Sequence, residues 1–423
     1  MDFYKKYSSG LRLVAKKLEN LYTVSFGVFV DVGCVKEDAD TNGYSHFIEH
    51  LLFKGTNKRT SLQISEEIDD IGANINAYTS KDNTCFYTKS AAEDLEKCID
   101  VLSDMYFNAT VPEDELEREK GVVLEEIKMC EDTPDDVSQD LVSKALFHNQ
   151  TLGQTILGNP DNIKYSDRHN ILNFKKKHYI PTNTVISVCG KFEFDALDKL
   201  IEQYFEANFS GTYAQTVVEP DVEYTSKFFH SFKQIEQSHI QLAWGGYGFA
   251  STDRYANNML ASILGGGMSS RLCQEIRERN GLAYSVYAYP SYYLKGGTFE
   301  IYVGLSPDNF AKTLIIIKRE LNKLLDDGIT QRELARARTQ AVNSLYMNVE
   351  NSMTLMRLYG RSMLKFNETF NADSEIEQYK SVGLEDINAV ARSVFAKSCA
   401  SAYVGPEIGD FKPLSQFKLN KRK

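Results

Sequence analysis

The sequence predicts an α+β protein made of two homologous repeats. Short segments rich in β-branched and aromatic residues alternate with longer segments of helical periodicity along the 423 residues. Three segments of the first half have counterparts in the second half: 24–32 in 239–244, 91–95 in 306–310, and 111–116 in 329–334. Glu333 stands 218 positions after Glu115, so the repeating unit takes up about half of the chain.

The first repeat opens with strands and then alternates between strands and helices. We expect strands where apolar residues recur with a period near two or fill a short run, at 11–15, 24–32, 74–79, 84–88 and 184–189. We expect helices where apolar residues recur every three to four positions, at 43–53, 61–72, 91–107, 112–130, 137–147, 166–178 and 194–206. Thr41 or Asn42 is available to cap the first of these helices, and Pro112 suits the first turn of the fourth.

A boundary between the repeats is expected where this periodicity stops. From about Asn208 to Ser226 the chain has no regular apolar pattern and contains glycine, proline and several acids. We therefore expect a first domain at 1–212, a linker at 213–227 and a second domain at 228–423. A chain of 423 residues is too long for one ordinary core, which agrees with two domains.

The composition is that of an ordinary folded protein with an acidic balance. The formal net charge of −10 argues against nucleic acids and anionic membranes as main partners, because both attract basic surfaces. The seven cysteines are scattered without CxxC spacing, which is typical of reduced thiols. No apolar run has the length of a signal peptide or a membrane span. We therefore expect a cytoplasmic protein in which the whole chain is the mature form.

The run His46-Phe47-Ile48-Glu49-His50 carries the clearest chemical signal. In a helix, residues four apart lie on one face, so the two imidazoles would converge, with Glu49 on the same side. The apolar neighbours predict a buried helix, in which these polar groups need a partner such as a divalent metal ion. The matching run of the second repeat, 259–264, has no histidine, so only the first repeat can hold the metal.

A zinc hydrolase needs a third protein ligand and keeps a fourth position open for water. The run 117–126 supplies the candidate donors, which are Glu117, Glu119, Glu125 and Glu126. The spacing of the histidines does not decide among these four glutamates. Histidine pairs four apart also occur in helices by chance, so the motif needs this second element.

These residues resemble a known family. The histidine run, followed by Leu51-Leu52-Phe53-Lys54-Gly55-Thr56, is similar to the motif of the inverzincin metallopeptidases, the family of pitrilysin, insulin-degrading enzyme and mitochondrial processing peptidase. The resemblance covers nearly the whole chain. It implies two repeats, each a mostly antiparallel sheet covered by helices, which together form half of a clamshell chamber.

The resemblance also implies roles for single residues. In the family, the third zinc ligand is a glutamate about 76 residues after the last histidine, and another glutamate precedes it by seven; here these are Glu126 and Glu119. His46, His50 and Glu126 would then bind one zinc ion, and Glu49 would be the general base that activates water. Glu119 would orient a ligand or the water, whereas without the family it would be a surface acid on a charged helix.

Substrate-binding residues follow from the same resemblance. The strand at 74–79 is similar to the edge strand to which a peptide substrate adds, with Asn76 and Ala77 as contacts, although an ordinary hairpin strand fits it equally well. Arg277 and Tyr284 are similar to the family's distal arginine and tyrosine, which donate to the substrate carbonyl oxygen. Without the family, they would be a surface arginine and a core tyrosine.

The expected function is that of a zinc-dependent endopeptidase that cleaves unfolded peptides inside an enclosed chamber. The chain has the length of the family's half-length members, which need a second chain, so we expect a homodimer or a heterodimer with a paralogous chain. The alternative is a noncatalytic scaffold or regulatory subunit of a processing-peptidase-like complex. Such subunits typically lose a ligand or the base, whereas this chain keeps His46, Glu49, His50 and Glu126.

Overall fold

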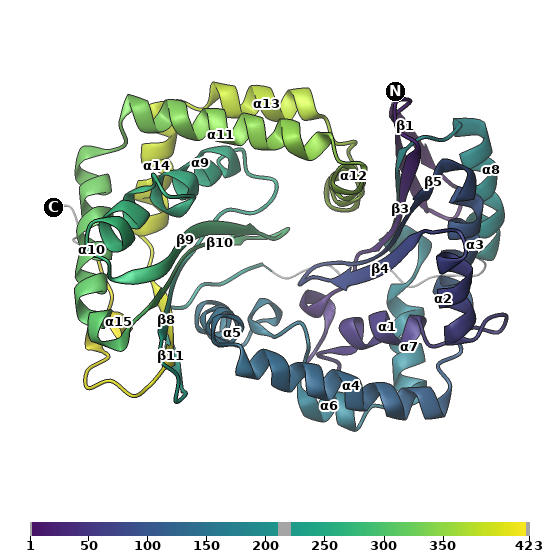
Figure 1. Cartoon of the computed structure of the whole chain (residues 1–423), viewed down its shortest axis with the longest axis horizontal. Helices are drawn as coiled ribbons and strands as arrows, with labels where there is room; N and C mark the ends of the chain where they lie inside the picture. Colours follow the sequence, from purple (N-terminus) through teal and green to yellow (C-terminus); the bar gives the residue numbers. More distant parts are fainter. Residues whose placement is uncertain (1, 210–220, 420–423) are drawn as a thin grey trace. The chain divides into compact units, whose positions relative to one another are not determined.

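The computed structural model describes residues 2–209 and 221–419 and has the α+β fold that the sequence predicts. The strands form two sheets, and helices accompany each sheet (Figure 1). Within the described residues, none of the helices has the length and apolar character needed to cross a membrane.

The first sheet has six strands in the order β1-β2-β6-β3-β5-β4. Their bounds are β1 (Asp2–Lys6), β2 (Arg12–Lys17), β3 (Thr23–Val30), β4 (Asn74–Thr79), β5 (Thr84–Ala91) and β6 (Thr184–Gly190). Strands β2 and β6 are parallel, and all other neighbours are antiparallel. Strand β1 was not expected because its sequence is mostly charged, and its side chains are exposed or half-buried.

The second sheet repeats this topology with five strands in the order β7-β11-β8-β10-β9. Their bounds are β7 (Phe228–Phe232), β8 (Ser238–Gly245), β9 (Ala283–Tyr292), β10 (Gly297–Leu305) and β11 (Ala400–Gly405). The pair β7 and β11 is parallel, as β2 and β6 are, and the remaining neighbours are antiparallel. From this pair onward the two strand orders match one to one, which confirms the repeat.

The helices of the first half are α1 (Tyr44–Leu52), α2 (Ser61–Asp69), α3 (Leu95–Asn108), α4 (Glu113–Asp132), α5 (Pro134–Phe147), α6 (Pro160–Lys164), α7 (Arg168–His178) and α8 (Phe194–Tyr204). Those of the second half are α9 (Arg254–Gly265), α10 (Phe310–Asp327), α11 (Gln331–Val349), α12 (Ser352–Phe366), α13 (Ala372–Ser381), α14 (Leu384–Phe395) and α15 (Lys412–Ser415).

Two helices pack on the sheet of the opposite repeat. Helix α5 belongs to the first half of the sequence but packs on β7, β8 and β11 of the second sheet. Helix α12 belongs to the second half and packs on β2, β3 and β6 of the first sheet, which are the equivalent strands. Gly360 permits this contact, because a Cβ atom there would lie 2.3 Å from the ring of Phe29.

This exchange divides the chain into two compact units of discontinuous sequence. One unit takes the described residues of Met1–Ile127, Thr155–Val218 and Met347–Asn371, and the other takes those of Lys128–Gln154, Glu219–Tyr346 and Ala372–Lys423. The predicted domains at 1–212 and 228–423 are continuous in sequence, whereas these units are defined by contacts in space. The two divisions therefore differ, and the predicted boundaries stay a prediction. Residues 213–220 of the expected linker lie outside the described residues.

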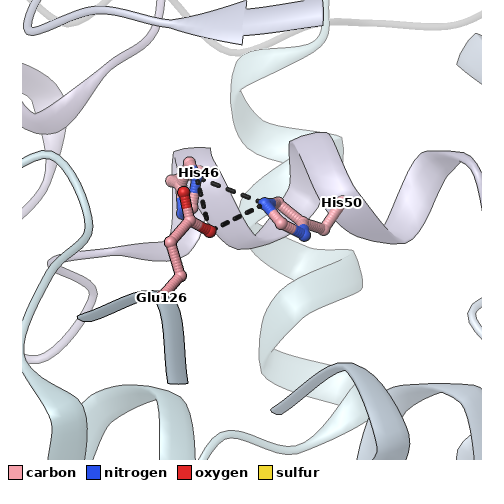
Figure 2. Close-up of side chains that lie close together, drawn as sticks. All are labelled: His46, His50 and Glu126. Atoms are coloured by element: carbon pink, nitrogen blue, oxygen red, sulfur yellow. Dashed lines mark hydrogen bonds and ion pairs between the residues drawn. The ribbon is translucent and has the colours of Figure 1, made fainter. Parts of the chain in front are cut away.

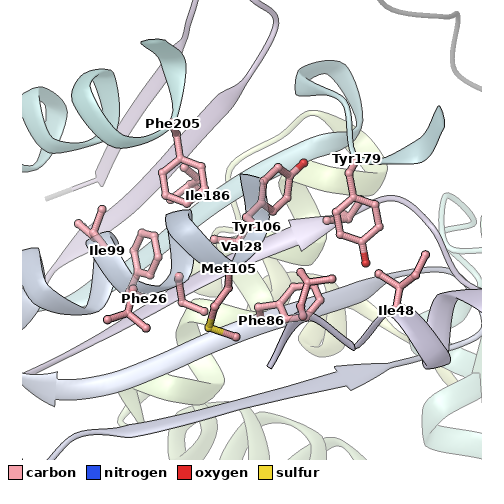
Figure 3. Close-up of a cluster of buried hydrophobic side chains, with 14 of the residues drawn as sticks. Phe26, Val28, Ile48, Phe86, Ile99, Met105, Tyr106, Tyr179, Ile186 and Phe205 are labelled. Atoms are coloured by element: carbon pink, nitrogen blue, oxygen red, sulfur yellow. The ribbon is translucent and has the colours of Figure 1, made fainter. Parts of the chain in front are cut away.

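The core of the first unit fixes helix α1 against the first sheet. Phe26 and Val28 from β3 and Ile186 from β6 meet Ile99 from α3 in one buried cluster (Figure 3). Ile48, on the apolar side of α1, belongs to the same cluster and is 1% exposed. The histidines of α1 are therefore held by a helix that is itself anchored in the core.

Candidate metal centre

At the start of helix α1, the buried carboxyl group of Glu37 accepts hydrogen bonds from backbone amides of the first turn. The backbone N–H groups of Gly43 and Ser45 donate to the Glu37 carboxyl oxygens at 2.8 and 2.7 Å. Gly43 is the N-cap residue. It has a left-handed φ of 104° and no side chain that could accept a capping hydrogen bond. The expected cap by Thr41 or Asn42 is therefore wrong, because an acid from outside the helix takes that role.

His46 and His50 lie one turn apart on the same face of α1 (Figure 2). Their Nε2 atoms are 3.3 Å apart. Glu126 of α4 points Oε2 at both rings, 3.4 Å from Nε2 of His50 and 3.7 Å from Nε2 of His46. Within residues 2–209 and 221–419, these three side chains form the one group with the spacing of a metal site.

The donor set fits a zinc ion. Zinc held in a tetrahedron by nitrogen and oxygen at about 2.0–2.2 Å places its ligand atoms about 3.3–3.6 Å apart. Two of the separations in this cluster, 3.3 and 3.4 Å, fall in this range, and the third, 3.7 Å between His46 and Glu126, is slightly longer. Two imidazoles and one carboxylate are also the kind of protein ligand set that catalytic zinc sites use, with one position left open.

Glu119 lies on the same face of α4 as Glu126 and behind His50. Its side chain is 3% exposed, with Oε1 2.9 Å from His50 Nδ1 and Oε2 2.7 Å from Lys54 Nζ. A carboxylate only accepts hydrogen bonds, so Nδ1 of His50 is the donor to Glu119, and in the neutral ring Nε2 then carries the lone pair that a metal ion needs. Glu125, by contrast, is exposed. Glu119 therefore contacts the outer nitrogen of the candidate ligand His50 and is not itself one of the three candidate ligands.

Burial and hydrogen bonds have opposing effects on the pKa values around the cluster, and burial prevails at His46. Burial, assisted by the neighbouring His50, lowers the pKa of His46 to about 3, so this imidazole is neutral as a ligand must be. Burial would lower the pKa of His50 too, but its hydrogen bond to Glu119 and the nearby carboxylates raise it above the usual value. Burial opposes the ionisation of Glu119, yet the bonds from His50 and Lys54 keep its pKa below the usual value.

Glu49 is held by a threonine of the edge strand. Thr79, the last residue of β4, donates from Oγ1 to Glu49 Oε2 at 2.5 Å. Burial raises the pKa of Glu49, although the Thr79 bond and the His50 charge act in the opposite direction. The sequence places Thr79 in a strand but gives no sign of this contact, because it depends on how β4 lies beside α1.

The strand proposed to bind substrate is at the edge of the first sheet. Strand β4 pairs with β5 on one side and ends the strand order on the other. Asn76 is exposed and Ala77 is half-buried, and the Asn76 side chain accepts a hydrogen bond from the Ala77 amide at 2.7 Å. The edge position is thus observed, whereas the substrate contact stays a prediction.

Arg277 and Tyr284 lie together in the second unit. Arg277 is in a π-helical segment (Cys273–Glu278), and Tyr284 is the second residue of β9. The guanidinium carbon of Arg277 is 5.5 Å from the centre of the Tyr284 ring, and both residues line a pocket of about 520 Å³. Tyr284 is 77% exposed, so the reading of it as a core tyrosine is wrong.

Comparisons with known proteins define the class to which this fold and site belong. The model of the insulinase family, peptidase family M16, matches residues 12–160. The model of the M16 inactive domain matches residues 167–341, which begin in the last part of the first repeat, after the histidine pair and Glu126, and extend into the second repeat.

Relatives of similar length are named as zinc proteases. The uncharacterized zinc protease YmxG of Bacillus subtilis is 36% identical and aligns with 95% of this chain and 98% of its own length. The uncharacterized zinc protease SCO5738 of Streptomyces coelicolor is 35% identical, with 94% and 88% covered. The chain therefore belongs to the M16 family of peptidases.

Solved structures share the fold at lower sequence identity. A protease from Helicobacter pylori has a TM-score of 0.88 at 21% identity, with 96% of this chain and 99% of that chain covered. A Pseudomonas fluorescens structure described as a peptidase M16 inactive domain has a TM-score of 0.89 at 18% identity, with 97% and 99% covered. At these sequence identities, the two matches support the fold of this chain and not its activity.

Proposed function

We propose that the protein is a zinc-dependent endopeptidase with an HxxEH motif and one zinc ion per chain. The observation that carries the proposal is the convergence of His46 Nε2, His50 Nε2 and Glu126 Oε2 within 3.3–3.7 Å of one another. Its position in a protease family, beside relatives named as zinc proteases, supports the same assignment.

Each side chain around the cluster has a distinct task in peptide hydrolysis. Zinc at this site supplies Lewis acid chemistry, which polarises a carbonyl and lowers the pKa of water to about 7. Glu49 binds Thr79 through Oε2, which leaves Oε1 to take a proton from the attacking water and to pass it to the leaving amine. Glu119 is a positioning residue that holds the ring of His50.

Substrates are proposed to be unfolded or extended peptides. A peptide that adds to the free edge of β4 would be held through its backbone, with Asn76 and Ala77 as the nearest partners. Such binding requires an extended chain and reads few side chains. Arg277 and Tyr284 are proposed as donors to the substrate carbonyl oxygen, because both can stabilise a developing negative charge.

The enclosing chamber is proposed to need a second chain. This chain would form half of a clamshell, completed by an identical copy or by a paralogous chain, and it would work in the cytoplasm. The alternative function, a noncatalytic scaffold or regulatory subunit, is favoured by the match of part of the chain to an inactive-domain model. The intact set of His46, Glu49, His50 and Glu126 favours the enzyme.

A digest of a peptide library separates the two functions. Purified protein is incubated with the library, with and without a zinc chelator, and the products are identified by mass spectrometry beside a native mass of the complex. If the protein is an endopeptidase, peptides are cleaved at internal bonds. The chelator abolishes this cleavage, and added zinc restores it. No cleavage by the zinc-loaded protein, alone or with its native partner, would favour the scaffold.

A further inference from the structure

Lys54 pairs with Glu119 beside the candidate metal centre, and among the described residues no hydrogen bond or ion pair joins its side chain to His46, His50 or Glu126. It follows helix α1 by two residues, and its amide donates to the carbonyl of Leu51 at 3.1 Å. The same short segment therefore carries His46, His50 and this lysine. The next residue, Gly55, has a positive φ of 122°, a conformation that glycine adopts more easily than other residues.

The ammonium group of Lys54 completes a chain of contacts that ends at His50. Lys54 Nζ is 2.7 Å from Glu119 Oε2, and the other oxygen of Glu119 is 2.9 Å from His50 Nδ1. Each carboxylate oxygen thus has one donor, and the two donors fix the plane in which the carboxylate lies. An ammonium group donates and never accepts, so it leaves Glu119 as the acceptor for His50.

This pair differs from an ordinary surface ion pair in the burial of its acid. Exposed pairs contribute little because water replaces either partner at small cost. The side chain of Glu119 is 3% exposed, whereas that of Lys54 is 26% exposed. Loss of the lysine would leave a buried carboxylate with one donor, and it would then be free to rotate or to draw in water.

The position of His50 depends on this support more than that of His46 does. The Nδ1 atom of His46 is buried and has no hydrogen-bond partner within the described residues. His50 is therefore the histidine of the pair whose ring is fixed by an outer carboxylate. Carboxylates in this position commonly orient metal-bound imidazoles, and their loss weakens metal binding about 10–100-fold.

We propose that Lys54 is a positioning residue of the metal centre: it holds the carboxylate of Glu119 against His50 and so keeps His50 Nε2 aimed at the metal. This inference rests on the proposed zinc site. It concerns metal affinity in the first place, because among the described residues the Lys54 side chain pairs with Glu119 and not with the ligand cluster or Glu49.

The test measures zinc affinity by competition with a chromogenic chelator, in the full-length protein. Lys54→Met is expected to weaken zinc binding about 10–100-fold and to alter the visible spectrum of the cobalt-substituted protein. Lys54→Arg, which keeps a cation, should recover most of the affinity. Lys58→Met is the matched control, because Lys58 carries the same charge and lines, together with Lys54, a surface pocket of about 820 Å³.

A double variant tests whether Lys54 acts through Glu119. In a Glu119→Gln background, Lys54→Met should change zinc affinity less than about twofold, because the contact it supports is already lost. Zinc affinity of Lys54→Met within about twofold of the unsubstituted protein, or an undiminished effect in the Glu119→Gln background, overturns the inference. If Lys54→Met does not fold, Lys54→Gln takes its place with the same criteria.

The experiment also separates this inference from the proposed function. An unsubstituted protein that binds no zinc overturns both. An unsubstituted protein that binds zinc tightly, together with a Lys54→Met variant that binds equally well, overturns the role of Lys54 alone.

Discussion

Thr79 Oγ1 donates a hydrogen bond to Glu49 Oε2 at 2.5 Å, which joins the edge strand β4 to the candidate general base on α1. The proposed peptide-binding strand and the proposed proton acceptor are therefore in direct contact. This bond occupies one acceptor site of Oε2 and orients the Glu49 carboxylate relative to the strand.

Thr79→Val should lower kcat without loss of zinc. Valine keeps the shape of threonine but removes the donor, and a hydrogen bond to a charged group contributes about 1.5–3 kcal/mol, so we expect a decrease of about tenfold or more. Steady-state kinetics on a cleaved peptide, with zinc analysis of the same samples, measures this. Thr79→Ser retains the hydroxyl and should stay close to the unsubstituted rate; equal activity of all three proteins would show that the Thr79 hydroxyl does not assist Glu49.

Glu49→Gln should keep zinc but lose hydrolysis. Glutamine has the size of glutamate but cannot take up the proton, and general-base catalysis contributes about 10²–10⁴-fold. Peptidase activity and zinc content measured on one preparation test this. Full activity of Glu49→Gln would show that the base is assigned to the wrong residue.

Glu126→Gln should weaken zinc binding by more than about 100-fold, because it removes a ligand and not only an outer partner. Glu125→Gln is the matched control: it removes the same charge from the adjacent position of α4, where the side chain is exposed. Zinc competition titrations compare the two variants. The reverse result, with binding lost in Glu125→Gln alone, would move the third ligand by one residue.

The sequence predicts the two histidines well because their geometry is local. Residues four apart in a helix converge whatever the rest of the fold does, so His46 and His50 follow from periodicity. The proposed third ligand lies on a distant helix, and the residues alone left four glutamates open until the family resemblance selected Glu126. In the structure Glu126 lies close to both histidines, and its role as a ligand stays a prediction.

The supporting side chains are not visible in the sequence. Thr79 and Lys54 act through contacts that exist only once β4, α1 and α4 are packed together. Glu37 likewise caps α1 from outside the helix, where a local capping pattern does not show it. Such contacts depend on tertiary structure, so residue spacing does not reveal them.

The exchange of helices between the sheets was also not predicted. The amphipathic pattern of α12 shows that one face is buried, but it does not tell which sheet buries it. The repeat itself was predictable because corresponding segments, such as those around Glu115 and Glu333, keep similar residues at a constant offset.

Gly360→Ala should destabilise the protein by about 1–3 kcal/mol, because the added methyl group meets the ring of Phe29 where α12 packs on the first sheet. Gly121→Ala is the control within a helix, since a Cβ atom there meets nothing within 4 Å, and it should be neutral or stabilise by up to about 1 kcal/mol. Urea unfolding midpoints compare the two. Equal stability of Gly360→Ala and the unsubstituted protein would contradict the close packing of α12.

Glu333 should contribute stability that depends on pH. Burial alone would raise its pKa, but hydrogen bonds from Arg271 and Thr330 and the Arg271 charge lower the pKa from 4.5 to about 2. The ionised form is favoured in the folded state, so this stability is complete above pH 4.5 and is lost as the pH falls toward 2.

Glu333→Gln should therefore be less stable than the unsubstituted protein at neutral pH, and the difference should shrink between about pH 5 and pH 3. Urea unfolding over this range measures it. Glu385→Gln breaks an ion pair whose acid is 74% exposed, so it should show little change at any pH. A difference for Glu333→Gln that does not vary with pH would exclude the proposed charge interaction.

His46, His50 and Glu126 are proposed to bind a zinc ion, and the metal content of the purified protein shows whether they do. Elemental analysis after gel filtration, without added metal, should find about one zinc per chain, and removal by a chelator should abolish peptidase activity until zinc is returned. Less than about 0.5 zinc per chain, together with activity that no chelator affects, would contradict the claim.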